Sequence, residues 1–406
     1  MTLFTHTLPN GLRIIHLQTE SQVAYCGFAV NVGARDESEK EHGLAHFVEH
    51  ALFKGTLRRK AWHILNRMEN VGGELNAYTT KESTFLYAIF MEKDLHRAVE
   101  LLSDLVVCSQ FPENELKKER EVILDEIQSY EDTPSELIFD EFENMLFDGH
   151  PIGHHILGKK KSLKKFNTAT CKSFLEQFYT AENMVFFCMS NTNFKQVIKI
   201  AEKYITPIPA QKTSVIREKP QVIRAHEVNR KKRTHLSHVI MGGRAYDMFN
   251  EKKYPLFLLN NMLGGPGMNS RLNVVLREKN GLVYHVESNV TSYTDTGVFS
   301  IYFGSDPKNR ERAISLAAKE ITRLCDNKLT TTQLAAAKKQ AIGQLGVAGD
   351  HKENLFLGLG KSFLHYNRYE TLPEVFAKVE KITAQQILEA ANEIFYPTGL
   401  FKLIYE

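Results

Sequence analysis

Residues 43–56 read GLAHFVEHALFKGT, and the centre of this stretch, HFVEH at 46–50, holds two histidines four positions apart. On an α-helix, residues four apart lie one above the other, so His46 and His50 can direct their imidazoles at one cation while Glu49 lies on the same side. Imidazole nitrogens bind Zn²⁺ at about 2.0 to 2.1 Å, and a catalytic zinc site has three protein ligands and one open position for water. The stretch therefore predicts two zinc ligands and requires a third from elsewhere.

The segment ENELKKEREVILDEIQSY, residues 113–130, is the nearest rich source of carboxylates. Its apolar residues form a stripe on an otherwise charged helix, and Glu119 and Glu126, seven positions apart, share a face. The alternative is a solvated face of charge pairs, which accounts for most helices of this composition. A chain with 16 histidines can also contain an H-x-x-E-H pattern by accident. The residues alone therefore leave open both a zinc site and a pair of polar helices.

Length and composition limit the class of protein. The chain has 406 residues, which favours two or more domains, and 43% hydrophobic with 24% charged residues is typical of a soluble globular protein. The net charge of +3 is too small to indicate nucleic acid or an anionic membrane as a partner. The first twenty residues read as a β-hairpin around Pro9-Asn10-Gly11 rather than a signal peptide, and no apolar run is long enough to cross a bilayer. We therefore expect a cytoplasmic protein without a nucleic acid or membrane partner.

The five cysteines occur singly, without C-x-x-C spacing and mostly inside apolar runs. This pattern favours buried free thiols over disulfides or a cysteine metal site. The residues concerned are Cys26, Cys108, Cys171, Cys188 and Cys325.

The chain divides into two halves. Between residues 204 and 236, prolines and charges replace helical periodicity and indicate a linker, so we expect domains at residues 1–210 and 225–406. The halves resemble each other, because an alternating strand, a turn and an amphipathic helix begin at both Ser83 and Gly297. Strands outnumber a regular β-α alternation, so the expected fold class is α+β, with one mixed domain type duplicated.

Extending the register of the two halves backward sets Glu49 and His50 beside Asn260 and Asn261. The second copy thus has asparagines where the first has the glutamate and the second histidine of the motif. We therefore expect only the first domain to keep the metal chemistry.

H-x-x-E-H is the signature of the inverzincin metallopeptidases, and GLAHFVEHALFKGT resembles the insulinase/pitrilysin peptidase family. In that family the third zinc ligand is a glutamate about 76 residues beyond the second histidine, and 126 − 50 = 76 gives Glu126. A supporting glutamate stands seven residues earlier in the family, where this chain has Glu119. The resemblance therefore implies that His46, His50 and Glu126 hold one Zn²⁺ per chain and that Glu49 is the general base.

GGELNAYTTKESTFLY, residues 72–87, resembles the family's edge strand that pairs with substrate. The resemblance implies that Asn76, Ala77 and Tyr78 contact an extended peptide, since an edge strand offers backbone groups to any such chain. The alternative is structural: Asn76 and Tyr78 can close a turn and fill the core.

SRLNVVLREKNGLVY, residues 270–284, resembles the second functional element of the family, an arginine and a tyrosine seven apart. Arg277 and Tyr284 fit that pair, and the resemblance implies that both donate hydrogen bonds to the substrate carbonyl or the oxyanion formed from it. The stretches HPIGHHILG at 150–158 and YTAENMVFF at 179–187 also resemble the family, so the similarity covers nearly the whole chain.

The resemblance further implies how the chain assembles and acts. Two homologous domains, each a mostly antiparallel sheet with helices, are expected in a chain of this size, with pairs of chains closing like a clam around a chamber that admits peptides. Both the zinc motif and the arginine and tyrosine pair stand in one sequence, which favours a homodimer with complete sites. A heterodimer, in which this chain is a partner-dependent or non-catalytic subunit of a processing peptidase, is the alternative.

Overall fold

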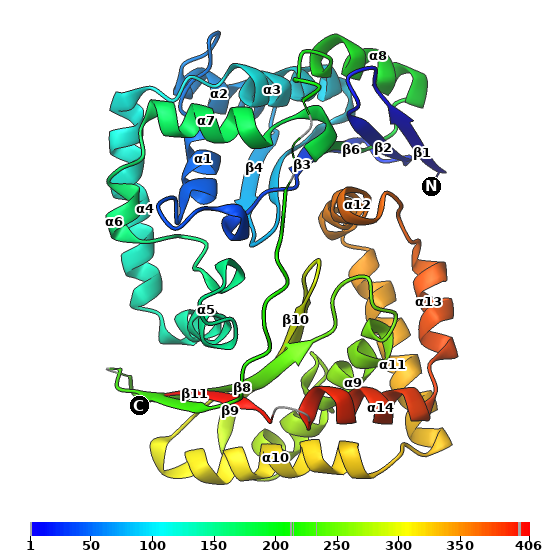
Figure 1. The fold of residues 1–406 in the computed structure, drawn as a ribbon. Helices are drawn as coiled ribbons and strands as arrows, with labels where there is room; N and C mark the ends of the chain where they lie inside the picture. The colour runs from blue at the N-terminus through cyan, green and yellow to red at the C-terminus, as the bar shows by residue number, and fades with distance from the viewer. Residues whose placement is uncertain (1, 212, 214, 233, 397–398) are drawn as a thin grey trace. The chain divides into compact units, whose positions relative to one another are not determined.

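The computed structural model describes residues 2–211, 213, 215–232, 234–396 and 399–406. Its contacts divide the chain into two compact units, each of which consists of three separate segments of the sequence. Unit 1 comprises Met1–Gln128, His154–Arg217 and His351–Tyr369, and unit 2 comprises Ser129–Gly153, Glu218–Asp350 and Glu370–Glu406. Each unit has its own sheet (Figure 1). Each also has its own apolar cores.

Unit 1 is built on a six-stranded sheet in the order β1-β2-β6-β3-β5-β4. All neighbouring strands are antiparallel except β2 and β6, which are parallel. The predicted hairpin is confirmed, since β1 and β2 pair across the Pro9-Asn10-Gly11 turn, where Gly11 has a φ of +90°. The strands are β1 (Thr2–Thr7), β2 (Arg13–Gln18), β3 (Val23–Val30), β4 (Glu74–Thr79), β5 (Thr84–Met91) and β6 (Met184–Ser190).

Both faces of this sheet are covered. Side chains alternate between the two faces along a strand, and those of the central strands are apolar on both. From β3, Cys26 and Phe28 enter the larger core, which lies under the helices of the first half. Tyr25 and Ala29 face the opposite way into a smaller core that α12 completes. The helices of the first half are α1 (Leu44–Leu52), α2 (Ala61–Glu69), α3 (Leu95–Cys108), α4 (Glu113–Glu131), α6 (Lys160–Leu163), α7 (Thr168–Phe178) and α8 (Phe194–Ile205), and α12 is Lys352–Tyr366.

Unit 2 repeats the plan with five strands in the order β7-β11-β8-β10-β9. Helices α9, α10 and α14 pack on one side of its core, and α5 packs on the other face of the sheet. The strands are β7 (Glu227–Arg230), β8 (Ser237–Ala245), β9 (Val283–Ser292), β10 (Gly297–Ser305) and β11 (Phe401–Tyr405). The helices are α5 (Pro134–Leu146), α9 (Lys253–Gly264), α10 (Arg310–Asp326), α11 (Thr331–Gly349), α13 (Leu372–Lys381) and α14 (Ala384–Phe395).

The two units share the element order that the sequence predicts. In unit 1, β5 leads through the short 3-10 helix η2 (Glu92–Asp94) into α3, and in unit 2, β10 leads through η6 (Pro307–Asn309) into α10. The edge strands β4 and β9 occupy equivalent places, each paired on one side only, to β5 and β10 respectively. The prediction of a duplicated, mostly antiparallel α+β domain is confirmed.

The compact units differ from the expected division at 1–210 and 225–406 in two helices. α5 packs on β8 and β11 and so counts with unit 2, whereas α12 packs on β2, β3 and β6 and counts with unit 1. Phe356 of α12 stacks on Phe187 of β6 with ring centroids 4.4 Å apart. The apolar stripe of a helix does not specify which sheet it covers, so sequence periodicity could not assign these two helices.

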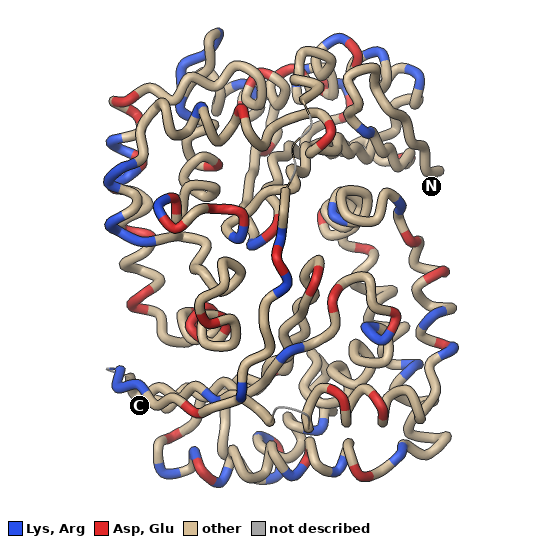
Figure 2. Tube along the Cα trace, viewed as in Figure 1, with Lys and Arg blue, Asp and Glu red and all other residues tan. Residues whose placement is uncertain are grey.

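The distribution of charged residues (Figure 2) and the state of the cysteines agree with what the sequence predicts. Figure 2 shows Lys and Arg mixed with Asp and Glu along the helices of both units, in keeping with the small net charge. All five cysteines are free, and all except Cys108 are buried, as predicted. Within the described part of the chain, no helix combines the length and the apolar character needed to cross a membrane.

Candidate metal centre

Helix α1 carries the H-x-x-E-H motif, and its first turn is held in place by a buried glutamate. The carboxylate of Glu37 accepts hydrogen bonds from the backbone N–H groups of Gly43 at 2.8 Å and Ala45 at 2.7 Å. Burial raises the pKa of Glu37, and the two N–H groups oppose that rise. Gly43 has a φ of +94°, and a Cβ at this residue would lie 2.8 Å from the carbonyl oxygen of Leu157. The start of α1 is therefore fixed by a glycine and by a carboxylate at its positive end.

His46, His50 and Glu126 each offer one ligand atom, and these three atoms lie within 4.8 Å of one another. The Oε2 atom of Glu126 is 3.8 Å from Nε2 of His46 and 3.7 Å from Nε2 of His50. Ligands at 2.0 to 2.1 Å in a tetrahedral zinc site are about 3.3 Å apart, so the Glu126 pairs must close by about 0.5 Å and no pair by more than about 1.5 Å (4.8 − 3.3). Two imidazole nitrogens and one carboxylate oxygen also form a ligand set that zinc accepts while leaving a position for water. The residues present therefore fit a zinc ion.

Burial makes the site asymmetric. The side chain of His46 is 9% exposed, whereas those of His50 and Glu126 are 23% and 44% exposed, so solvent reaches the group from the Glu126 side. Burial, together with the neighbouring His50, lowers the pKa of His46 to about 3. The His46 imidazole is therefore neutral at physiological pH, which is the form that binds a metal.

Glu119 and Lys54 support the second histidine. The Oε1 atom of Glu119 lies 2.8 Å from Nδ1 of His50, and its Oε2 atom lies 2.6 Å from the ammonium of Lys54. Burial alone would raise the pKa of Glu119, but the hydrogen bonds from His50 and Lys54 outweigh it and lower that pKa. A His50 that donates its Nδ1–H to this carboxylate keeps its Nε2 lone pair available for a metal.

Glu49 lies next to the ligand group and makes a separate contact. Its Oε2 atom accepts a hydrogen bond from the hydroxyl of Thr79, at the end of β4, at 2.8 Å. Burial raises the pKa of Glu49, while the Thr79 hydrogen bond and the neighbouring His50 lower it. A buried carboxylate with a raised pKa beside a potential metal site has the properties that a general base requires.

The predicted substrate residues Asn76, Ala77 and Tyr78 lie on β4, at the edge of the sheet. Ala77 packs against the core under the helices, and Tyr78 points to the opposite face, where its ring stacks on Phe85 with centroids 4.8 Å apart. Burial raises the pKa of the Tyr78 hydroxyl. The side chain of Tyr78 thus has a packing role, and the backbone along the free edge of β4 is what a peptide could meet.

Arg277 and Tyr284 belong to unit 2. Arg277 lies in a π-helical turn, η5 (Asn273–Glu278), with its side chain 41% exposed and 3.5 Å from the carboxylate of Glu278. Tyr284 is the second residue of β9 and is 90% exposed. Their exposure leaves both side chains free to contact a peptide, and the role assigned to them stays a prediction.

In unit 2, asparagines stand at the positions that correspond to Glu49 and His50. Asn260 and Asn261 line a cavity of about 470 Å³ between α9 and β9, as do Arg277 and Glu287. Among the described residues, the group of three potential metal ligands occurs only at His46, His50 and Glu126.

The sequence motif did not identify three residues that support the potential metal ligands or Glu49. Lys54 stands four positions after His50, so helical spacing could have suggested it. Thr79 stands two positions after Ala77, on the strand face that meets the helices. Glu37 is in a loop, where no periodicity marks it.

Comparisons with known proteins match nearly the whole chain. The family model described as "Insulinase (Peptidase family M16)" matches residues 13–160, and the one described as "Peptidase M16 inactive domain" matches residues 165–341. The "uncharacterized zinc protease YmxG" of Bacillus subtilis (strain 168) is 31% identical over 392 residues, covering 96% of this chain and 95% of that protein. An "uncharacterized zinc protease" of Rickettsia bellii is 32% identical over 391 residues, covering 96% of this chain and 94% of that protein.

Two solved structures share the fold. A protease from Helicobacter pylori superposes with a TM-score of 0.93 at 21% identity, covering 100% of this chain and 99% of that one. A peptidase M16 inactive domain from Pseudomonas fluorescens gives a TM-score of 0.92 at 19% identity, with coverages of 100% and 98%. At these identities the agreement concerns the fold alone.

Proposed function

Because the chain belongs to the insulinase family of peptidases (M16), we propose that it is a zinc-dependent endopeptidase that hydrolyses peptides or unfolded protein segments. The observation that carries the proposal is the convergence of His46, His50 and Glu126, with Glu49 beside them. The relatives named zinc proteases support the same metal and the same class of reaction.

In the proposed site, His46, His50 and Glu126 hold one zinc ion per chain. When bound, zinc lowers the pKa of a water molecule toward neutrality and polarises the carbonyl of the peptide bond. Glu119, braced by Lys54, keeps the His50 ring in the orientation in which Nε2 faces the ion.

Glu49 has the role of general base. Its Oε2 atom accepts a hydrogen bond from the Thr79 hydroxyl, and the carboxylate accepts the proton of the attacking water. The same carboxyl group then donates this proton to the leaving amine, which completes the cleavage.

Residues outside the ligand group bind the substrate. The peptide adds as a strand to the open edge of β4 along Asn76, Ala77 and Tyr78, through backbone hydrogen bonds that do not depend on its sequence. Arg277 and Tyr284 donate hydrogen bonds to the carbonyl under attack and to the oxyanion that forms from it.

We further propose that the chain acts in the cytoplasm as a homodimer whose chamber admits peptides and excludes folded proteins. The presence of the zinc motif and of Arg277 and Tyr284 in one chain supports this assembly over a heterodimer. Light scattering of the purified chain tests it, because a dimer mass is expected and a monomer would contradict the proposal.

The proposed activity is tested with the purified chain and a quenched fluorescent peptide. We expect about one zinc per chain, cleavage that a chelator stops and added zinc restores, and no cleavage of a folded protein. Glu49→Gln is the matched variant: it should keep the zinc and lose most of the turnover. Zinc without cleavage, reversed by adding a related partner chain, would instead establish the partner-dependent subunit, and an absence of zinc would contradict the proposal.

A further inference from the structure

Thr79 contacts Glu49, the proposed general base. Its hydroxyl donates to Oε2 of Glu49 at 2.8 Å, and the Glu49 side chain lies in a buried position. Within the described residues, this is the one hydrogen bond that the Glu49 carboxylate receives. We infer that Thr79 is a positioning residue that holds the general base in its reactive orientation, an inference that rests on the proposed function of Glu49.

The orientation of Thr79 follows from strand geometry. Side chains alternate along β4, and Leu75 and Ala77 pack against the core beneath the helices, so Thr79 faces the same side. α1 contacts β4 on that side, which brings the hydroxyl against the helix that carries Glu49. Tyr78, on the opposite face, stacks on Phe85 and so fixes the rotation of the strand just before Thr79.

The turn that follows Thr79 is braced by backbone contacts. Thr80 donates its N–H to the carbonyl oxygen of Ser83 at 2.8 Å, and its carbonyl oxygen accepts the N–H of Ala34 at 3.1 Å. The close approach requires a glycine at position 33, because a Cβ there would lie 2.3 Å from the Thr80 carbonyl oxygen. The end of β4 is therefore held against the loop that precedes α1.

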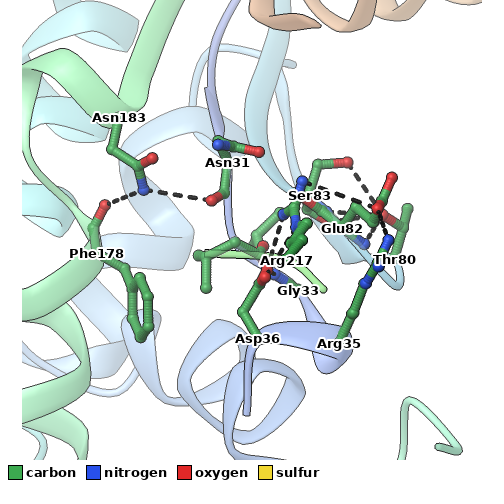
Figure 3. A network of polar contacts seen from close by, with 12 residues as sticks. Asn31, Gly33, Arg35, Asp36, Thr80, Glu82, Ser83, Phe178, Asn183 and Arg217 are labelled. Atoms are coloured by element: carbon green, nitrogen blue, oxygen red, sulfur yellow. Dashed lines mark hydrogen bonds and ion pairs between the residues drawn. The ribbon is translucent and has the colours of Figure 1, made fainter. Parts of the chain in front are cut away.

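Ion pairs reinforce the same turn (Figure 3). The Arg217 guanidinium donates to both carboxylate oxygens of Asp36, at 2.9 and 2.8 Å, and to the carbonyl oxygen of Glu82 at 2.8 Å. Arg35 pairs with the Glu82 carboxylate at 2.6 Å, and both side chains are almost fully buried. Two arginines thus anchor the β4–β5 turn, which fixes the point from which the Thr79 hydroxyl reaches Glu49.

This arrangement serves the base in two ways. A buried carboxylate without a donor could rotate between orientations, and the hydroxyl selects one of them. The contact is made to Oε2, so among the described residues Oε1 stays open to a water molecule. Since β4 is the strand expected to pair with the peptide, the same strand holds both the substrate and the base, and their relative position is set by one short segment of backbone.

Thr79→Val tests the inference, because valine keeps the shape of threonine and removes the hydroxyl. We expect kcat to fall about 10- to 100-fold, the range found when a hydrogen-bond partner in the outer shell of a metal site is removed, with KM changed less than about twofold and the zinc content unchanged. Thr79→Ser, which restores the hydroxyl, should recover most of the lost turnover. Thr5→Val, at an exposed position on β1, is the matched control and should behave as wild type.

Two further measurements separate positioning from folding. In a Glu49→Gln background, Thr79→Val should lower the residual turnover no further, because the hydroxyl acts through the carboxylate. A crystal structure of Thr79→Val should show the Glu49 side chain rotated or in more than one orientation.

The outcomes distinguish this inference from the proposed function. An active wild type with Thr79→Val unchanged in kcat, with Thr79→Ser as impaired as the valine variant, or with Glu49 unmoved in the variant structure would overturn the positioning role alone. A wild type that cleaves no peptide in a chelator-sensitive manner would overturn the proposed function, and the inference with it.

Discussion

Glu119→Gln is expected to weaken zinc binding without touching a zinc ligand. The wild-type carboxylate makes two contacts, to Nδ1 of His50 at 2.8 Å and to the ammonium of Lys54 at 2.6 Å, and its side chain is only 8% exposed. Glutamine keeps one oxygen that can accept from His50. It turns an N–H₂ group toward Lys54, however, where two donors then face each other.

The expected loss of zinc affinity follows from the hydrogen bond between Glu119 and His50. Loss of a carboxylate that orients a metal-bound histidine typically costs 10- to 100-fold in metal affinity, or about 1.4 to 2.7 kcal/mol. Competition with a chromophoric chelator measures this affinity directly. Glu121→Gln, an exposed position on the same helix, removes one charge at a distance from the site and is the matched control.

Turnover gives a second readout of the same variant. Glu119 does not contact the substrate in the proposed mechanism, so excess zinc should restore most of the activity of Glu119→Gln. Equal zinc affinities for the Glu119 and Glu121 variants would refute the support role, and activity that excess zinc fails to restore would show that Glu119 takes part in the reaction itself.

Three other changes have defined outcomes. Lys54→Met should weaken zinc binding less than Glu119→Gln does and add little to it in the double variant, since both break one chain of contacts; full additivity in the chelator assay would contradict this. Burial lowers the pKa of His16 from about 6.5 to about 4. Between these pH values the unfolded chain binds a proton that the folded protein does not bind. The free energy of unfolding therefore falls as the pH drops from about 6.5 to about 4. His16 accounts for about 2 kcal/mol of this loss at pH 5, so urea unfolding between pH 7 and pH 5 should show a loss about 2 kcal/mol larger in wild type than in His16→Gln, and equal losses would contradict the assignment. Tyr284→Phe should keep the zinc content and lower the turnover on a peptide, and full activity would remove this hydroxyl from the mechanism.

The sequence predicts the ligand group better than its support. His46 and His50 follow from helical spacing, and Glu126 follows from the family resemblance, which places the third ligand about 76 residues beyond the second histidine. Glu37 and Arg217 stand in irregular segments that have no periodicity, so their contacts with α1 and with the β4–β5 turn depend on the folded backbone.

The fold shows the same limit. Strand alternation and the repeated strand-turn-helix pattern give the duplicated α+β domain, because these patterns are local in sequence. The helices α5 and α12 join units that their positions in the chain do not suggest. Tyr78 illustrates the difficulty within one strand: resemblance points to the substrate, while its ring packs on Phe85.

The most direct test of the central claim is the position of the metal. Crystals of the protein grown with zinc, measured on both sides of the zinc absorption edge, should give one strong anomalous peak at about 2.0 to 2.2 Å from a nitrogen of His46, a nitrogen of His50 and an oxygen of Glu126. The Glu49 carboxylate should lie beside the peak without being a ligand. A strong peak elsewhere, or none between these three side chains in a protein that binds zinc in solution, would contradict the assigned site.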